Sequence, residues 1–325
     1  MLAFCFLYQG GFKQSKDDKF LSDRPVTYIN EVLWVYLAYV GATLVLADTR
    51  ASVNKTDLSL TLKIVKDESI SIMLIFGYML HDMINIRKLE NLRSLRVGVS
   101  TGQVLNVDHA LMLKDLLPNL RLYNYYGSNE AGYLGYECDR YDGYTKILDE
   151  VEMKVINSEG NVVPLGETGE ACIRSPATMK GYIRDVGLVP GLDQDGWFHT
   201  DDLVIMNENR EIKVLDRASD VIKRAGVLIF PKPIEDMLTK PPKVASAVVI
   251  GVPDTRLHEE ISAVIVPSET DLTEDELRTW CNENSSEDHL GFSMVPMHYK
   301  FLANVPLLAN GKVNKRAIKD IFVSK

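Results

Sequence analysis

The sequence predicts an α/β fold in two domains, and three changes of pattern along the chain support this prediction. Before residue 145, helical and strand patterns alternate, which is typical of helices covering a largely parallel sheet. From Thr145, short alternating runs are separated by Gly and Pro, and from about Asp216 helices and strands mix again. A chain of 325 residues is long enough for two domains. We therefore expect a large domain over 1–215, β-rich from about 145, and a small α+β domain over 216–325.

The most apolar stretch of the chain is VLWVYLAYVGATLVLA, residues 32–47. It is shorter than the roughly 20 apolar residues that a membrane-spanning helix needs, and Gly41 interrupts it. We therefore expect a buried helix leading into a buried strand over 42–47, and no transmembrane segment.

The next runs predict the alternating part of the large domain. ISIMLIFGYMLHDM, residues 70–83, has apolar residues in helical rhythm and predicts a helix. LRSLRVGVS, residues 92–100, predicts the end of a helix and then a short strand. VDHALMLKDLLPNL, residues 107–120, predicts an amphipathic helix that stops near Pro118. RLYNYYG, residues 121–127, predicts a strand that runs into a glycine turn.

Beyond residue 145 the patterns become shorter. The run 146–175 alternates apolar and polar residues, which predicts hairpins or a small barrel. In the small domain, DVIKRAG at 220–226 and KPIEDML at 232–238 predict helices, and 245–252 and 261–267 predict strands. A further helix is predicted to begin at Thr273, because Thr273 and Glu276 have the spacing of a capping box.

Composition and charge exclude several classes of function. Hydrophobic residues make up 46% and charged residues 25%, as in ordinary globular proteins. The net charge of -9 repels phosphate backbones, so nucleic acid is not an expected partner. The cysteines have no CxxC and no paired His spacing, so we expect reduced thiols, a cytosol-like compartment and no zinc site. They are Cys5, Cys138, Cys172 and Cys281.

Two segments place acidic side chains where ligands bind. Asn129 and Glu130 follow the strand end at Gly127, and a carboxylate there suits Mg²⁺ with substrate phosphates, although an ordinary turn is the alternative. Asp202, in DGWFHTDD, has the chemistry to accept both hydroxyls of a ribose, and Arg217 to donate to ribose or phosphate. The alternative for this pair is a hairpin with solvated side chains.

Two further positions stand in turns. Gly226 closes DRASDVIKRAG, where the alternative is the C-cap of a helix. Lys312 follows the turn 309–311 directly and precedes a helix rich in Lys and Arg. Taken alone, such a lysine is an ordinary solvated side chain.

Six segments together resemble the adenylate-forming superfamily of acyl-CoA synthetases, 4-coumarate-CoA ligases and insect luciferases, most of all the insect luciferase-like acyl-CoA ligases. In chain order they are LRVGVSTGQVL, YNYYGSNEAG, PLGETGEACIRSPATMKGYI, DGWFHTDD, DRASDVIKRAGVLIFP and LLANGKVNKRAIK. The resemblance runs from about Val26 to the C-terminus. It implies an adenylation domain and a C-terminal lid domain.

The resemblance also implies a two-step reaction. A carboxylic acid, expected to be a fatty acid, attacks the α-phosphate of MgATP to give acyl-AMP, and the thiol of coenzyme A then displaces AMP. Along the chain it implies adenine contacts for Gly102, Gln103 and Tyr126, nucleotide contacts for Gly127 and Asn129, a Mg²⁺ ligand in Glu130, and ribose contacts for Asp202 and Arg217. It implies a hinge at Asp216, passage of the pantetheine arm at Gly226, the thioester step for Lys223 and the adenylation step for Lys312.

Some features depart from the family pattern. Residues 1–25 do not supply the Ser/Thr/Gly-rich phosphate loop, so we expect a truncated adenylation domain. Asn129 stands where the family has threonine, Asp201 where it has glycine and Pro233 where it has glutamate. An impaired relative that only binds nucleotide, acyl chain or a partner is therefore the alternative function, and luciferase-like oxygenation is a weaker third. The chain ends in Ser-Lys without the leucine of a peroxisomal signal, which implies the peroxisome or the cytoplasm.

Overall fold

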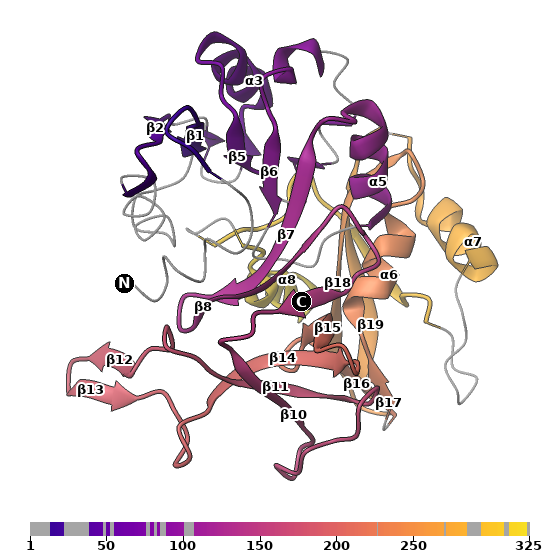
Figure 1. The fold of residues 1–325 in the computed structure, drawn as a ribbon. Coiled ribbons are helices and arrows are strands. Elements are labelled where there is room, and N and C mark those ends of the chain that lie inside the picture. The colour runs from indigo at the N-terminus through magenta and orange to yellow at the C-terminus, as the bar shows by residue number, and fades with distance from the viewer. Residues whose placement is uncertain are drawn as a thin grey trace. The chain divides into compact units, whose positions relative to one another are not determined.

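The computed structural model divides the chain into two compact units, residues 1–214 and 215–325, and each is described by itself (Figure 1). The structure describes residues 14–22, 39–47, 50–52, 55–75, 79–80, 83–84, 89–100, 107–225, 227–269, 271–284, 294–308 and 312–323. Among these residues, no helix has both the length and the apolar character needed to cross a membrane.

The first unit begins with a parallel layer. Its strands are β1 (Lys19–Ser22), β2 (Thr43–Leu46), β5 (Ile72–Leu74), β6 (Val97–Ser100) and β7 (Arg121–Ser128). They pair in the order β2-β1-β5-β6-β7, and every one of these pairings is parallel. All their carboxyl ends therefore lie at one edge of the sheet, where ligands of parallel sheets bind.

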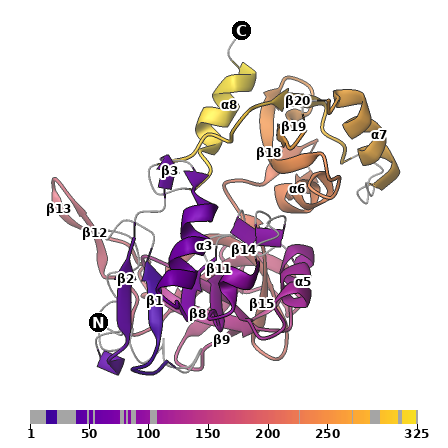
Figure 2. The same ribbon diagram turned by 90° about the horizontal axis from the view of Figure 1, so that it is seen from above.

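Both faces of this parallel layer are apolar. Helices α3 (Leu58–Asp67) and α5 (Val107–Leu116) pack on one face through Leu62 and Leu113, beside Met73 of β5 (Figure 2). The other face holds a separate cluster that includes Ile72 of the same strand and Tyr125 of β7. Alternate residues of one strand thus serve two cores, as expected for a parallel sheet buried on both sides. A short 3-10 helix spans Leu89–Leu92.

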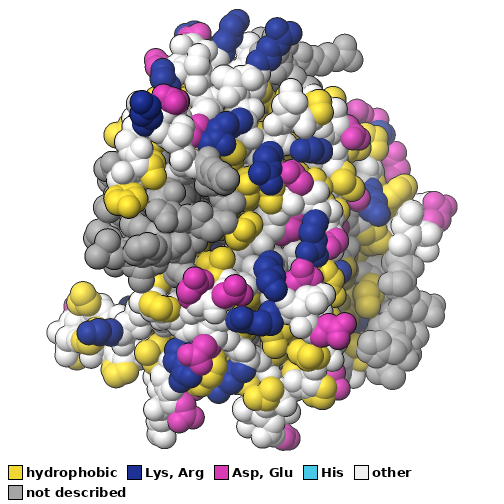
Figure 3. All heavy atoms as spheres, viewed as in Figure 1, with side chains coloured by type: hydrophobic (Ala, Val, Ile, Leu, Met, Phe, Trp, Pro, Cys, Tyr) yellow, Lys and Arg dark blue, Asp and Glu magenta, His cyan; other side chains and the backbone are white. Residues whose placement is uncertain are grey.

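After β7 the same sheet continues with the strands of the β-rich part of the unit. They are β8 (Gly132–Cys138), β9 (Thr145–Ile147), β10 (Glu152–Ile156), β11 (Thr168–Arg174), β14 (Phe198–Met206) and β15 (Glu211–Arg217), in the order β8-β9-β15-β14-β11-β10. Two separate hairpins are β3 (Arg50–Ser52) with β4 (Lys55–Thr56), and β12 (Gly181–Arg184) with β13 (Gly187–Pro190). The β12–β13 hairpin exposes apolar side chains, visible in yellow at the lower left of Figure 3.

The second unit is a small sheet with helices on both faces. Its strands are β16 (Ile222–Arg224), β17 (Val227–Ile229), β18 (Val244–Asp254), β19 (His258–Pro267) and β20 (His298–Phe301). Its helices are α6 (Pro231–Leu238), α7 (Glu274–Asn284) and α8 (Lys315–Val323). Val249 of β18 faces the core formed with α6 and α7, and its neighbour Val248 packs with Ile318 of α8.

Several predicted elements are confirmed and others are wrong. The capping box is present, because Thr273 Oγ1 accepts the Glu276 N–H at 3.2 Å and the Glu276 carboxylate accepts the Thr273 N–H at 2.8 Å. The helix predicted over 70–83 is wrong in its first half, because 72–74 form β5, a doubly buried strand whose continuous apolar run mimics a helical pattern. In its second half, residues 79–80 and 83 are helical. The helix predicted over 220–226 is also wrong, because 222–224 form a strand of the β16–β17 hairpin. The strand over 42–47 forms as β2 at the sheet's edge, and it is only half-buried.

Candidate functional site

The carboxyl ends of β6 and β7 carry buried hydroxyl groups. Ser100 ends β6 and Ser128 ends β7, and both hydroxyl oxygens are buried. Within the residues that the structure describes, neither hydroxyl has a hydrogen-bond partner. A buried polar group without a partner costs free energy unless a ligand or water satisfies it. Neither serine was predicted from the sequence as a site residue, although both end strands inside the segments that resemble the family.

The turn after β7 positions Asn129 and Glu130. Glu130 is half-buried, its carbonyl accepts the Met179 N–H at 2.7 Å, and its Oε1 accepts the Tyr182 hydroxyl at 3.2 Å. Asn129 is exposed. Burial, followed by the nearby Glu130 carboxylate, raises the pKa of Tyr182, so this phenol remains a hydrogen-bond donor at neutral pH. The Glu130 carboxylate is therefore fixed at the ligand edge of the sheet.

Gly127 is required by the close approach of the two hairpin strands. Gly127 of β7 pairs with Tyr133 of β8, directly after a shift in strand register between Tyr126 and Gly127. A Cβ at this position would overlap the carbonyl oxygen of Gly132. The packing of β7 against β8 is therefore a structural reason for glycine, separate from any contact with a nucleotide.

Tyr126 and Asp202 meet although they come from different strands. The Tyr126 hydroxyl on β7 donates to Asp202 Oδ2 on β14 at 2.9 Å, and both residues are half-buried. The Asp202 N–H donates to Thr200 Oγ1 at 3.1 Å, and that hydroxyl donates to the carbonyl of Ala171 at 2.8 Å. The Tyr126 phenol, near the end of β7, thus holds the Asp202 carboxylate, and the turn that carries Glu130 follows the same strand end.

Asp202 is placed by a bulge in β14. Cys172 pairs with His199 and Glu170 pairs with Leu203, so two steps along β11 match four steps along β14. Inside this bulge Asp201 has a positive φ of 62°, and its N–H donates to Glu170 Oε1 at 3.0 Å. The left-handed conformation explains why a glycine suits this position better than aspartate.

The predicted residues of the second unit lie near its first strands. The Asp216 carboxylate accepts the N–H groups of Arg217 at 2.9 Å and Lys232 at 3.3 Å, and burial raises the pKa of Asp216. Arg217 and Lys223 are exposed, and the Lys223 N–H donates to Glu259 Oε2 at 2.7 Å. Asp216 is therefore tied to the backbone, whereas the side chains of Arg217 and Lys223 are exposed.

Lys312 sits in a closed loop. Leu307 bridges Val313, and the Leu308 N–H donates to the Lys312 carbonyl at 2.8 Å. Two residues further on, Asn314 Oδ1 accepts the Ala317 N–H at 3.0 Å and caps α8. The Lys312 side chain is exposed. Gly102, Gln103 and Gly226 lie outside the described residues.

Two family models match the chain. The model for the AMP-binding enzyme family matches residues 1–183, and the model for the AMP-binding enzyme C-terminal domain matches residues 233–312. The chain belongs to the AMP-binding enzyme family. Glu130 lies within the first match and Lys312 is the last residue of the second, whereas Asp202, Arg217 and Lys223 lie between the two.

Curated relatives of this AMP-binding chain are named as CoA ligases. It is 28% identical over 237 residues to the long-chain-fatty-acid–CoA ligase of Haemophilus influenzae, which covers 71% of this chain and 41% of that protein. It is 31% identical over 175 residues to the oxalate–CoA ligase of Arabidopsis thaliana, covering 54% and 33%. It is 33% identical over 178 residues to the mitochondrial medium-chain acyl-CoA ligase ACSF2 of Macaca fascicularis, covering 54% and 28%. The chain thus spans less than half the length of these relatives.

Solved structures of similar fold confirm the predicted fold class, an α/β domain followed by a smaller α+β domain. The amide bond synthetase McbA from Marinactinospora thermotolerans gives a TM-score of 0.84 at 23% identity, covering 99% of this chain and 65% of that one. ATP-bound MatB from Rhodopseudomonas palustris gives a TM-score of 0.84 at 19% identity, covering 98% and 63%.

Proposed function

We propose that this AMP-binding chain performs the chemistry of an acid–CoA ligase. A carboxylate oxygen attacks the α-phosphorus of ATP and pyrophosphate leaves, which gives acyl-AMP. The thiol of coenzyme A then attacks the acyl carbon, AMP leaves and the thiol proton is released. Curated relatives named for fatty-acid and other acid–CoA ligases support this proposal, and a fatty acid is the proposed substrate.

The observation that carries the proposal is the contact between Tyr126 and Asp202 at 2.9 Å. A carboxylate held by one phenol still has oxygen lone pairs for the two hydroxyls of a ribose. The tyrosine ring would pack near the adenine, with Gly102 and Gln103 as proposed partners. The buried hydroxyls of Ser100 and Ser128 supply further donors at the same strand ends for the nucleotide, beside Gly127 and Asn129.

Glu130 fits a magnesium ion. Its carboxylate offers hard oxygen ligands, its turn is fixed through the Met179 N–H, and one carboxylate plus substrate phosphates is the usual Mg²⁺ site. When bound, the ion would neutralise phosphate charge as pyrophosphate leaves. The Tyr182 hydroxyl would keep Glu130 oriented in the meantime.

The second unit supplies the remaining proposed roles. Lys312, exposed on its closed loop, would stabilise the charge that develops during adenylation, and Lys223 would serve the thioester step. Asp216 would act as the hinge residue and Arg217 would contact the ribose. Gly226 would leave room for the pantetheine arm of coenzyme A, because a residue without a side chain permits close approach.

The test is a pair of measurements on the purified chain. Calorimetry should detect AMP binding, and pyrophosphate release should require MgATP and one of a panel of medium- and long-chain acids, with coenzyme A added to allow repeated turnover. AMP binding without pyrophosphate release would identify a nucleotide-binding relative instead of a ligase. No binding of AMP would overturn both readings.

A further inference from the structure

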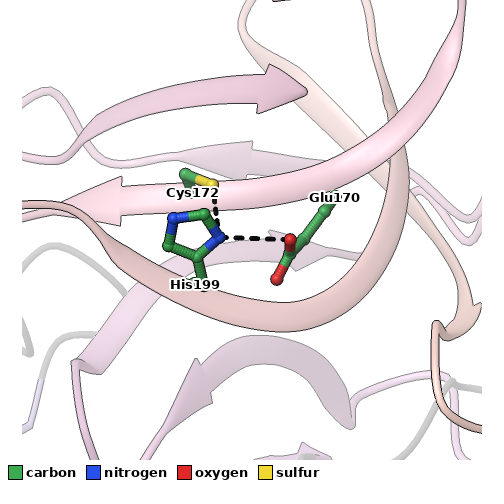
Figure 4. Close-up of side chains that lie close together, drawn as sticks. All are labelled: Glu170, Cys172 and His199. Atoms are coloured by element: carbon green, nitrogen blue, oxygen red, sulfur yellow. Dashed lines mark hydrogen bonds and ion pairs between the residues drawn. The ribbon is translucent and has the colours of Figure 1, made fainter. Parts of the chain in front are cut away.

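Three metal-ligating side chains converge in the β-rich part of the first unit, apart from the proposed nucleotide contacts. Glu170 and Cys172 are two residues apart on β11, and His199 pairs directly with Cys172 on β14. Figure 4 shows the carboxylate, the thiol and the imidazole directed toward one another. One potential ligand atom from each residue lies within 4.8 Å of the other two.

Nδ1 of His199 has two neighbours and makes a full hydrogen bond with only one of them at a time. Nδ1 of His199 lies 3.6 Å from Sγ of Cys172 and 3.2 Å from Oε2 of Glu170. With a proton this nitrogen donates to one acceptor, and without a proton it accepts from one donor. When Nδ1 and the thiol have both lost their protons, the three ligand atoms each offer a lone pair to one cation.

Two of the three ligand separations fit a tetrahedral zinc ion. With bonds of about 2.0–2.3 Å, such an ion holds nitrogen and sulfur ligands about 3.6 Å apart, and nitrogen and oxygen ligands about 3.4 Å apart. The corresponding separations here are 3.6 Å and 3.2 Å. A thiolate and an imidazole select zinc over magnesium or calcium, which prefer oxygen ligands.

A fourth residue orients the histidine from outside the cluster. Nε2 of His199 lies 3.4 Å from Oδ2 of Asp193. The other oxygen of Asp193 accepts the N–H groups of Asp195 at 3.0 Å and Trp197 at 2.8 Å, so the carboxylate is fixed by the turn. A carboxylate on the second ring nitrogen is the usual companion of a histidine that binds a metal, because it leaves Nδ1 free as the ligand.

A nucleophilic role for Cys172 fits the structure less well. The residue is fully buried, and burial together with Glu170 raises the pKa of its thiol to about 12. A thiol of this kind is a poor nucleophile at neutral pH. His199 keeps 44% of its side chain exposed, so the imidazole side of the cluster reaches solvent.

We propose that Glu170, Cys172 and His199 form a zinc-binding site, with Asp193 positioning the histidine and a water molecule as the fourth ligand. Cys172 binds as the thiolate, and its proton passes to solvent. Because the other oxygen of Glu170 holds the Asp201 N–H, the bound ion also fixes the bulge that precedes Asp202. The spacing of the cysteines along the chain predicted no zinc site, because the ligands come from two strands that only the sheet brings together.

The test uses the untagged full chain, treated with a chelator and then titrated with Co²⁺ as a spectroscopic probe. We expect a thiolate-to-cobalt charge-transfer absorption that saturates at one ion per chain and that Zn²⁺ removes by displacement. Cys172→Ser should abolish this absorption. Cys138→Ser is the matched control, because Cys138 is a free thiol elsewhere in the same unit, and it should retain the absorption.

Two further variants separate binding from a loss of fold. His199→Gln changes a half-exposed side chain, so it should fold and yet lose the absorption. Asp193→Asn should weaken Zn²⁺ binding about 10–100-fold while the absorption keeps its form. The proposal is overturned if the wild-type chain gives no thiolate absorption with cobalt, or if that absorption survives in both Cys172→Ser and His199→Gln. Neither readout depends on nucleotide binding.

Discussion

At the scale of single residues, Asp202 carries the sharpest prediction. Asp202→Ala should weaken AMP binding by about 2–5 kcal/mol, because it removes charge-assisted hydrogen bonds to the ribose. Tyr126→Phe should cost about 1 kcal/mol, since it removes only the contact that orients Asp202. Asp149→Ala is the control, because its side chain is 91% exposed. Calorimetry measures all three, and unchanged AMP affinity in Asp202→Ala would exclude this residue from the site.

At the neighbouring Asp201 we expect glycine to give a more stable protein than alanine, which reverses the usual order of stability. At an ordinary position Ala is more stable than Gly by about 0.5–1 kcal/mol. At a φ of 62° the Cβ is strained by about 1–2 kcal/mol, so Asp201→Gly should be more stable than Asp201→Ala. Both variants lose the aspartate side chain equally, and urea unfolding therefore isolates the backbone term. An Asp201→Ala protein more stable than Asp201→Gly would refute the strain.

The sequence identified Tyr126 and Asp202 separately but not their contact. They are 76 residues apart, and only the order β7-β8-β9-β15-β14 brings their strands into one sheet. The same limit hid the cluster of Glu170, Cys172 and His199, because cross-strand register is set by the bulge in β14 and not by spacing along the chain. A motif predicts a residue's chemistry, whereas sheet topology decides its neighbours.

At the scale of elements, Asp18 joins the amino ends of three parallel strands. Its carboxylate accepts the Ser71 hydroxyl before β5 and the Arg96 guanidinium before β6, both at 2.8 Å, while Asp18 itself precedes β1. Burial opposes its ionisation, but the hydrogen bonds from Arg96, Ser15 and Ser71 outweigh it and lower the pKa of Asp18 below 3.8. The structure thus ties the parallel layer together at the edge opposite the proposed ligand site.

These hydrogen bonds of the Asp18 carboxylate predict how the free energy of unfolding depends on pH. Because the folded pKa is lowered, the stabilisation is present above 3.8 and is lost as pH falls through the folded value. Asp18→Asn should cost about 1–3 kcal/mol at neutral pH. Urea unfolding curves should converge for the wild-type chain and Asp18→Asn only as pH falls through the folded pKa of Asp18, which lies below 3.8. A difference that stays constant from neutral to acid pH would show that the charge of Asp18 contributes nothing.

Sequence patterns predicted elements best where one face is exposed. The helix predicted over 107–120 formed as α5, and the capping box at Thr273 formed as expected, because a helical repeat of apolar residues or a side-chain cap leaves a local signal. The outer face of α5 is not purely polar, because Leu111 and Met112 are exposed. The doubly buried β5 and the tight hairpin around Ala225 did not follow prediction. In β5 both faces are apolar, so the strand shows no alternation of apolar and polar residues. In the hairpin Ala225 has a positive φ of 51°, a conformation that an alanine in the sequence does not indicate.

At the scale of the whole molecule, two lysines of the second unit are proposed to serve different half-reactions. Both lysines are exposed, and each stands in its own hairpin or loop of the second unit. Lys312 is proposed for adenylation because a positioned ammonium stabilises the charge that spreads over carboxylate and phosphate as their bond forms. Lys223 is proposed for the thioester step, next to the glycine that would admit the pantetheine arm.

This division predicts opposite effects of two substitutions. Lys312→Ala should slow acyl-AMP formation by an amount corresponding to about 3–4 kcal/mol, yet spare thioester formation from supplied acyl-AMP. Lys223→Ala should slow thioester formation and spare adenylation. Lys240→Ala, an exposed lysine after α6, is the control and should change neither rate. Pyrophosphate release measures the first half-reaction and AMP release from acyl-AMP the second, and an equal loss of the same half-reaction in both variants would contradict separate roles for the two lysines.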